Sequence, residues 1–216
     1  GADAQILYSG WASDMMIQQL REAIGAGVDG IGMMGHPGNE AIMPLAEDAH
    51  KAGILMMYQN VDVPEVRAKY GGGYVGANLA TQGKELGREA IRRFGFKAGD
   101  TAIVMVPIGD YSRAQREDGV RIVFEEHGMK VVVLDGTPEQ ATDPNSAIGY
   151  ISTALAANPE TKVLVHTGGQ MLGNSETFAT AAGYGPNELL QIGFDTSPQV
   201  MSAFVNGYAH LTSDQQ

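Results

Sequence analysis

Short apolar runs alternate with longer amphipathic stretches along most of the chain. The runs resemble buried parallel strands, and the stretches between them repeat apolar residues at helical spacing, as Met16, Ile17 and Leu20 do. Such alternation indicates β-α-β units, in which helices cover the faces of a parallel sheet. The expected strands are 6–8, 30–34, 54–58, 102–106, 131–134, 162–166 and 189–195.

The pattern weakens over 61–70 and restarts with a helix expected over 78–94. Between them lies 71–76, which literally matches the dinucleotide fingerprint G-x-G-x-x-G. We reject the match because the fingerprint needs an apolar strand directly before it and a helix that opens within it. The run is interpreted instead as a crossover between two lobes. The predicted fold class is therefore α/β, with two doubly wound parallel-sheet lobes over 1–76 and 77–214, joined by hinge crossovers.

Composition narrows the classes of function. The 216 residues are 44% hydrophobic and include 29 Gly, which fits a packed globular protein and argues against disorder. A net charge of −11 disfavours a nucleic-acid surface, since phosphate binding needs clustered Lys and Arg. The small basic cluster on one expected helix is interpreted as a solvated face; its members are Arg88, Arg92, Arg93 and Lys97.

Several chemistries lack their sequence signatures. The chain has no Cys, which excludes disulfides, thiolate catalysis and Cys-based metal sites, and is compatible with an oxidising compartment. No apolar run approaches the roughly 20 residues needed to cross a membrane. We find no Gly-x-Ser-x-Gly elbow, P-loop or His-Glu-x-x-His motif. We therefore expect neither an enzyme nor a protein with a cofactor or metal.

The run 189–195 ends abruptly at an aromatic residue and a carboxylate, Phe194 and Asp195. In open parallel sheets, ligands bind outside the carboxyl ends of strands. An apolar face beside a fixed acceptor suits a polyhydroxyl ligand. The alternative is that Phe194 belongs to the core and Asp195 only starts the next helix.

These features together resemble the type I periplasmic sugar-binding proteins, the ribose-, galactose- and inositol-binding receptors of ABC transporters. The resemblance is carried by Phe194-Asp195 after a strand, by Arg116-Glu117-Asp118-Gly119 early in a helix, and by the two successive series of strands and helices. It implies an absent opening strand and helix of lobe one, and a return hinge that starts at 215–216. We therefore expect an internal piece of a longer protein.

The resemblance also implies roles for individual residues. Asp195 looks like the carboxylate that accepts hydrogen bonds from two sugar hydroxyls, with Phe194 as its aromatic neighbour. Arg116 looks like the donor to ring or hydroxyl oxygens, for which its planar fork is suited. Gln215 matches the hinge Gln that completes the sugar contacts. We set aside a salt bridge from Arg116 to Glu117 or Asp118, because adjacent helical residues do not face each other.

Three positions depart from the family pattern and leave the ligand open. Asn60-Val61 stands where the ribose receptors carry an Asp-Arg pair, and Gly35-His36 replaces an Asn. Thr167-Gly168-Gly169 replaces another Asn after the strand that ends near Val165. A linear polyol therefore stands beside an aldose as a candidate ligand.

Substitute contacts are proposed for the altered positions, each with a simpler alternative. From lobe one, His36 and Asn60 are candidates, although His36 could simply cap its turn. From lobe two, His166 and Tyr111 are candidates, although His166 could be a satisfied core histidine. Trp11, the only Trp, is expected to cover the sheet edge rather than line the binding site.

The expected function is a non-enzymatic solute receptor that closes its lobes on a monosaccharide or polyol. Its partner would be the permease of an ABC transporter. The receptor would be a monomer, periplasmic or lipid-anchored outside a Gram-positive cell. The alternative is the effector-binding core of a lac-repressor-type transcription regulator, whose DNA-binding helices would precede residue 1.

Overall fold

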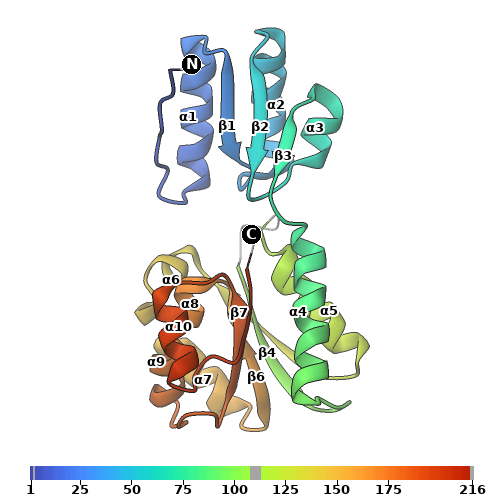
Figure 1. Cartoon of the computed structure of the whole chain (residues 1–216), viewed down its shortest axis with the longest axis vertical. Coiled ribbons are helices and arrows are strands. Elements are labelled where there is room, and N and C mark those ends of the chain that lie inside the picture. The colour runs from blue at the N-terminus through green and yellow to red at the C-terminus, as the bar shows by residue number, and fades with distance from the viewer. Residues whose placement is uncertain (2, 108–112, 215–216) are drawn as a thin grey trace. The chain divides into compact units, whose positions relative to one another are not determined.

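Two compact units make up the chain, and each is described by itself (Figure 1). The computed structural model describes residues 1, 3–107 and 113–214, without the side chains of 138 and 141. Unit 1 comprises Gly1–Ala77 and unit 2 comprises Asn78–Gln216. Both are α/β units with parallel sheets, as the alternating pattern predicted.

Unit 1 is built on a parallel three-stranded sheet with the order β1-β2-β3. Its strands are β1 (Gly30–Met34), β2 (Leu55–Gln59) and β3 (Gly73–Val75). Its helices are α1 (Ser13–Ala26), α2 (Gly38–Lys51) and α3 (Pro64–Tyr70). The short helix α3 fills the stretch where the sequence pattern weakened, and β3 lies inside the Gly-rich run.

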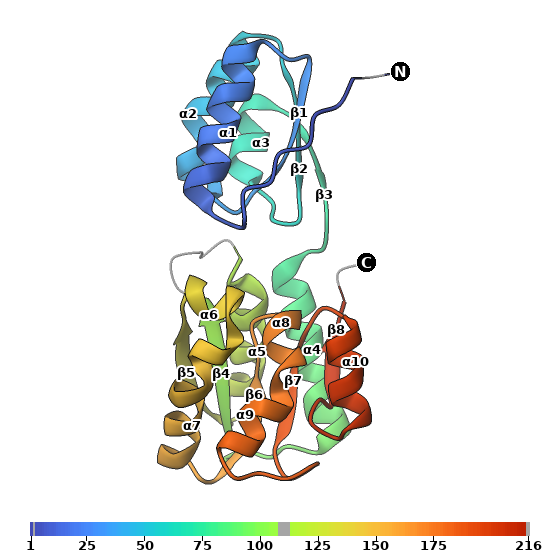
Figure 2. The ribbon, with the colours of Figure 1, turned by 90° about the vertical axis from the view of Figure 1, so that its left-hand side faces the viewer.

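Within the described residues of unit 1, helices cover one face of this sheet and leave the other face uncovered. Met33 and Tyr58 point to the side of the three helices, where they pack with Ile42 and other apolar residues. Because side chains alternate along a strand, Leu55 and Val75 point the opposite way, and they are 77% and 62% exposed. Figure 2 shows α1, α2 and α3 on one side of the unit 1 strands.

The strand expected over Ile6–Tyr8 is wrong, because the segment has no regular structure. Isolated strands are not stable by themselves, and a strand forms only where a neighbour supplies its hydrogen bonds. In the described part of the chain, β1 pairs with β2 alone and the segment has no strand partner. Its side chains Ile6, Leu7 and Tyr8 are consequently exposed.

Unit 2 is built on a five-stranded parallel sheet with the order β5-β4-β6-β7-β8. The strands are β4 (Thr101–Pro107), β5 (Lys130–Gly136), β6 (Thr161–Val165), β7 (Leu190–Phe194) and β8 (Leu211–Ser213). The helices are α4 (Leu79–Phe94), α5 (Gln115–Glu126), α6 (Pro138–Thr142), η1 (Pro144–Ala147), α7 (Ile148–Ala157), α8 (Gly169–Gly173), α9 (Ser175–Ala181) and α10 (Pro198–Val205). Strand β8 was not among the strands expected from the sequence.

Both faces of the unit 2 sheet are covered, as in a doubly wound fold. On one face, Val104 and Phe194 pack with Phe124 of α5 and with residues of α4. On the other, Ile103 packs with Ile151 of α7 and with residues of α8 and α9. The apolar side chains of the central strands therefore pack alternately into two cores, which explains why these strands are hydrophobic at every position.

Helices α4 and α5 approach closely because small residues line their contact. A Cβ on Gly83 of α4 would overlap the backbone carbonyl of Arg116, and a Cβ on Gly119 of α5 would lie 2.7 Å from the carbonyl oxygen of Ala80. A Cβ on Gly87 of α4 would make a tight contact, 3.1 Å, with Cβ of Val123. This contact fixes where the first turn of α5, and with it Arg116, lies.

Candidate functional site

The candidate site of unit 2 lies where parallel strands end. Asp195 directly follows β7, and its backbone has a left-handed φ of 67°. That conformation is strained for a residue other than Gly and persists only where the surroundings impose it. Here the Asp195 N–H donates to the Ser213 carbonyl at 2.9 Å, and Thr212 Oγ1 donates to the Asp195 carbonyl at 2.7 Å. Strand β8 thus anchors the carboxylate.

Three residues predicted from the sequence come together here, namely Arg116, Phe194 and Asp195 itself. Arg116 donates from Nη1 to Asp195 Oδ1 at 3.0 Å and from Nη2 to Oδ2 at 3.3 Å. Its guanidinium lies over the Phe194 ring, 4.4 Å from the centroid, which is a cation–π contact. The Arg116 side chain is fully buried, whereas that of Asp195 is 36% exposed. Asp195 is therefore the solvent-accessible member of the pair.

Glu117 contacts Arg116, so the reason given for excluding this salt bridge was wrong. Arg116 donates from Nε to Glu117 Oε1 at 3.3 Å, and both side chains are fully buried. Adjacent residues leave a helix in different directions, but a long guanidinium side chain reaches back with Nε while its terminal nitrogens point to Asp195. The attraction between opposite charges is stronger in the protein interior than in water, because the effective dielectric constant is lower there. Burial raises the pKa of the Glu117 carboxyl, and the two neighbouring guanidiniums oppose that shift.

A second arginine joins the cluster, and sequence reasoning missed it. Arg113 donates from Nη1 to Glu117 Oε1 at 3.4 Å and from Nη2 to the Thr167 carbonyl at 2.9 Å. Arg116 Nη2 donates to the same carbonyl at 2.9 Å. The available signal was the i, i+4 spacing of Arg113 and Glu117, which favours a contact at a helix start.

The Thr167-Gly168-Gly169 turn contributes backbone atoms rather than a side chain. The Gly169 N–H donates to Asp195 Oδ2 at 3.4 Å, and the Thr167 carbonyl accepts from both arginines. A Cβ on Gly168 would lie 3.3 Å from Nη2 of each arginine and 3.4 Å from Asp195 Oδ2. The turn that replaces the family's Asn therefore brings its main chain against three charged groups.

His166 lies in the core and not in this cluster. Its Nε2 is 2.9 Å from Gln191 Oε1, and its ring stacks on Phe178 with centroids 5.5 Å apart. The ring is fully buried. Because side chains alternate along β6 and its continuation, His166 points to the α9 side of the sheet, whereas Val165 points to the α5 side. His166 is therefore a core histidine, although its Nδ1 has no hydrogen-bond partner among the described residues.

The buried His166 ring should make unit 2 sensitive to acid. Burial lowers its pKa from 6.5 to about 4. Between these values the unfolded chain binds a proton that the folded chain does not, so the free energy of unfolding falls as pH drops. The expected loss is about 3 kcal/mol between pH 6.5 and pH 4, with no further loss from this group below its folded pKa.

Urea unfolding at several pH values tests this expectation with wild type and His166→Gln. The amide of the variant can still donate to Gln191, but it does not titrate. His210, whose pKa burial also lowers, is present in both proteins and cancels in the comparison. Identical pH slopes for the two proteins would contradict the expectation.

In unit 1, two predicted residues lie together at the ends of neighbouring strands. His36 follows β1 and Asn60 follows β2, and His36 Nε2 lies 2.9 Å from Asn60 Oδ1. The Trp11 ring is 5.6 Å from the His36 ring, tilted by 57°, and Trp11 is largely exposed. Trp11 therefore lies against His36. An aromatic face, an imidazole and an amide are thereby gathered at the carboxyl end of this sheet.

Two further predicted contacts, Tyr111 and Gln215, lie outside the described residues. In the described ranges, no group of three or more His, Cys, Asp or Glu side chains is arranged to hold a metal ion. No helix among those residues is both long and apolar enough to cross a membrane.

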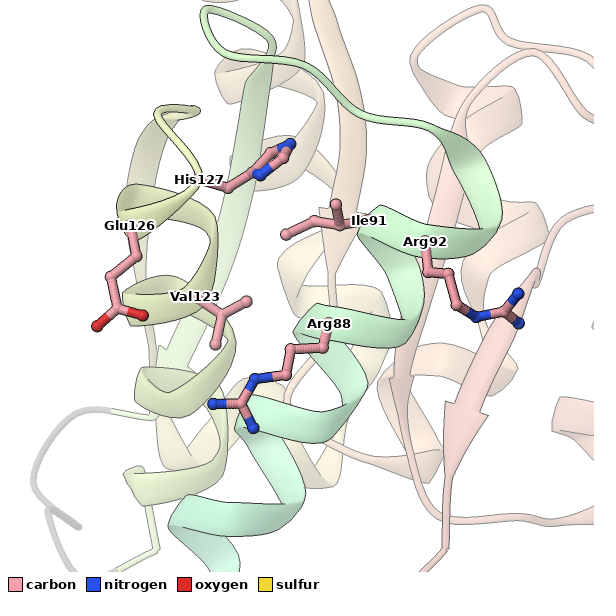
Figure 3. A pocket seen from close by; sticks show the side chains of 6 residues that line it. All are labelled: Arg88, Ile91, Arg92, Val123, Glu126 and His127. Atoms are coloured by element: carbon pink, nitrogen blue, oxygen red, sulfur yellow. The ribbon is translucent and has the colours of Figure 1, made fainter.

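A separate pocket lies on unit 2 between α4 and α5, and it contains no predicted site residue. Figure 3 shows its lining, which is Arg88, Ile91, Arg92, Val123, Glu126 and His127. The basic residues here are matched within α4, because Arg88 pairs with Glu85 and Arg92 pairs with Glu89. This pairing fits the interpretation of the basic cluster as a solvated face.

The fold is that of a parallel α/β protein, and each of its two units carries a polar cluster at the ends of its strands. The sequence matches the periplasmic binding protein domain over residues 1–216, and the chain belongs to that family. No curated protein matches the chain. The predicted resemblance to type I periplasmic sugar-binding proteins is confirmed at the level of family and fold.

Solved structures share this fold at low sequence identity. A periplasmic sugar-binding protein of an ABC sugar transporter from Legionella pneumophila matches with a TM-score of 0.79 and 20% identity, over 94% of this chain and 73% of that one. An ABC transporter solute-binding protein from Agrobacterium vitis with bound D-fucose matches at 0.79 and 18%, over 96% and 69%. A carbohydrate transporter from Acidothermus cellulolyticus in complex with myo-inositol matches at 0.76 and 22%, over 94% and 66%.

Proposed function

We propose that this chain is the ligand-binding part of an ABC transporter receptor that binds a monosaccharide or polyol between its two units. The observation that carries the proposal is the Arg116–Asp195 pair on the Phe194 ring, with the Asp195 carboxylate partly exposed. A carboxylate held by a buried guanidinium is fixed in position, and its remaining lone pairs can accept from hydroxyl groups. The D-fucose and myo-inositol complexes of proteins with this fold support a polyhydroxyl ligand.

Residues of unit 1 would complete the binding site. His36 and Asn60 supply polar atoms there, and the exposed face of Trp11 suits the C–H surface of a sugar ring. Aromatic faces with a few fixed polar groups are the usual lining of small-molecule sites. Tyr111 and Gln215 remain proposed contacts from the resemblance.

Closure about the crossover would bring the two sets of residues onto one ligand, a common transition in periplasmic binding proteins. The Tyr74 hydroxyl lies 2.8 Å from the carbonyl oxygen of Ala77 and 3.1 Å from that of Asn60. The single hydroxyl proton is therefore shared between a carbonyl of the crossover and a carbonyl of the loop that carries Asn60. A Cβ on Gly76 would overlap this hydroxyl, so the crossover needs Gly there.

The remaining parts of the proposal follow from this role. The receptor would present its closed form to the membrane permease, act as a monomer without nucleic acid, and not turn its ligand over. Its place would be the periplasm, or the outer surface of a Gram-positive cell with a lipid anchor.

Calorimetry on the full-length protein tests the proposal with pentoses, hexoses, inositols and linear polyols. Asp195→Ala should weaken binding of the best ligand about ten- to a hundredfold, the effect of losing a hydrogen bond to a charged group. Asp118→Ala is the matched control, because Asp118 is an exposed carboxylate on α5 that pairs with Arg121. Wild-type affinity in Asp195→Ala would refute the site, and a panel without any binder would refute the ligand class.

A further inference from the structure

The cluster in unit 2 contains a buried carboxyl that the proposed binding function does not use. Glu117 is fully buried on α5, and its Oε2 has no hydrogen-bond partner among the described residues. A buried carboxyl with an unsatisfied oxygen is costly, so its retention calls for an explanation in the surroundings. Those surroundings are two guanidiniums.

Glu117 Oε1 is shared by the two arginines. It accepts from Arg113 Nη1 at 3.4 Å and from Arg116 Nε at 3.3 Å. On the other side, the Thr167 carbonyl accepts from Nη2 of both arginines. The two like charges are therefore held side by side, with a carboxylate at one end and a carbonyl at the other.

This arrangement decides which edge of Arg116 meets the ligand-binding carboxylate. With Nε occupied by Glu117, the edge formed by Nη1 and Nη2 is directed at Asp195, which it contacts through both nitrogens. A guanidinium held at Nε and at its paired edge cannot rotate about its long axis without losing one of these contacts. Its plane over Phe194 is set in the same way.

We propose that Glu117 is a positioning residue for ligand binding, which holds Arg116 against Asp195 and makes ligand affinity depend on pH. The proposal rests on the proposed function of Arg116 and Asp195. A protonated Glu117 accepts more weakly from Arg116 Nε and no longer neutralises the paired guanidiniums, which then repel each other and leave Arg116 less firmly held. The Asp195 carboxylate that Arg116 holds is then less well fixed for the ligand, so affinity falls as pH falls.

The charged groups around Glu117 fit this coupling. Among the described residues, Arg116 and Arg113 act on its carboxyl, and Asp195 reaches it only through Arg116. From α4 the contact with α5 is made by small residues and by backbone atoms, such as the Lys84 nitrogen that would lie 2.8 Å from a Cβ on Gly119. Because burial raises the pKa of Glu117 above 4.5, protonation starts at a higher pH than for an ordinary Glu.

Glu117→Gln in the full-length protein tests the proposal, because it keeps the shape of the side chain and removes its titration. The probe is the best ligand of the sugar and polyol panel, with the dissociation constant measured from about pH 8 to about pH 5. The variant should bind about five- to tenfold more weakly than wild type at pH 8, the difference between a charged and a neutral hydrogen bond. Wild type should approach the variant as pH falls. Any pH dependence from His36 is common to both proteins and cancels in their ratio.

Three outcomes are decisive. A constant ratio of the two dissociation constants across this pH range would overturn the proposal, as would a variant that binds like wild type at pH 8. If Asp195→Ala binds like wild type as well, the proposed function fails with it, whereas loss of binding in Asp195→Ala alone isolates the failure to Glu117. Should Glu117→Gln not fold, a dissociation constant of wild type that stays flat from pH 8 to pH 5 overturns the proposal by itself.

Discussion

Replacing Arg116 with alanine is expected to destabilise unit 2 by about 3–5 kcal/mol and to abolish ligand binding. The guanidinium is fully buried and neutralises two carboxyl groups, those of Asp195 and Glu117. Its removal leaves Glu117 buried with Arg113 alone, and an uncompensated buried charge is what makes the loss of one partner so costly. Urea unfolding followed by circular dichroism measures the free energy, and calorimetry measures the binding.

Two further variants distinguish the loss of this buried arginine from the loss of an arginine at the surface. Arg121→Ala removes a guanidinium of α5 that pairs with the more exposed carboxylates of Asp118 and Glu125. Such surface pairs contribute about 0–1 kcal/mol. Adding Glu117→Gln to Arg116→Ala should recover part of the stability, because it removes the stranded carboxylate. A loss in Arg116→Ala no larger than in Arg121→Ala would contradict the role of the buried cluster.

Gly83→Ala is expected to destabilise unit 2, although alanine is the better helix former. The helix propensity gained is about 1 kcal/mol. Against it stands the overlap of the new Cβ with the Arg116 carbonyl, which is backbone and cannot move aside as a side chain would. Overpacking costs about 1–3 kcal/mol, and the upper end applies to an overlap with backbone, so the net loss should be about 2 kcal/mol. Ligand affinity should fall too, since α5 must shift to make room.

Gly149→Ala provides the matched control. Gly149 lies in α7, where an added Cβ meets nothing within 4 Å. Its substitution should therefore leave stability unchanged or raise it by up to about 1 kcal/mol. If Gly83→Ala proves as stable as Gly149→Ala in urea unfolding, the contact between α4 and α5 accommodates the added Cβ and the prediction is wrong.

The elements of unit 2 could be predicted where an apolar run is buried on both faces of the sheet, as for 102–106. Ile6–Tyr8 has equally good strand residues, but a strand also needs a neighbour to pair with, and no local pattern reports that neighbour. Strand β8 was missed for the converse reason. It has three residues, and its pairing with β7 rather than its composition makes it a strand.

Within the site, the charged and aromatic residues of β7 and α5 were found because their types and positions are distinctive. The Thr167 carbonyl and the Gly169 N–H were not, since backbone groups carry no signature of residue type. Glu117 was excluded by a rule about neighbouring Cβ directions that a long side chain evades. His166 could have been assigned to the core by counting alternation along its strand.

The uncovered sheet face of unit 1 has a consequence for how this chain unfolds. Unit 2 removes apolar side chains from water on both faces of its sheet, whereas unit 1 does so on one face. Burial of apolar area is the main favourable contribution to folding, so unit 1 has the smaller margin of stability. We expect a denaturant titration of these 216 residues to pass through a state with unit 2 folded and unit 1 unfolded. A single midpoint then describes neither unit, and the free energies given for Arg116 and Gly83 belong to the later of two transitions.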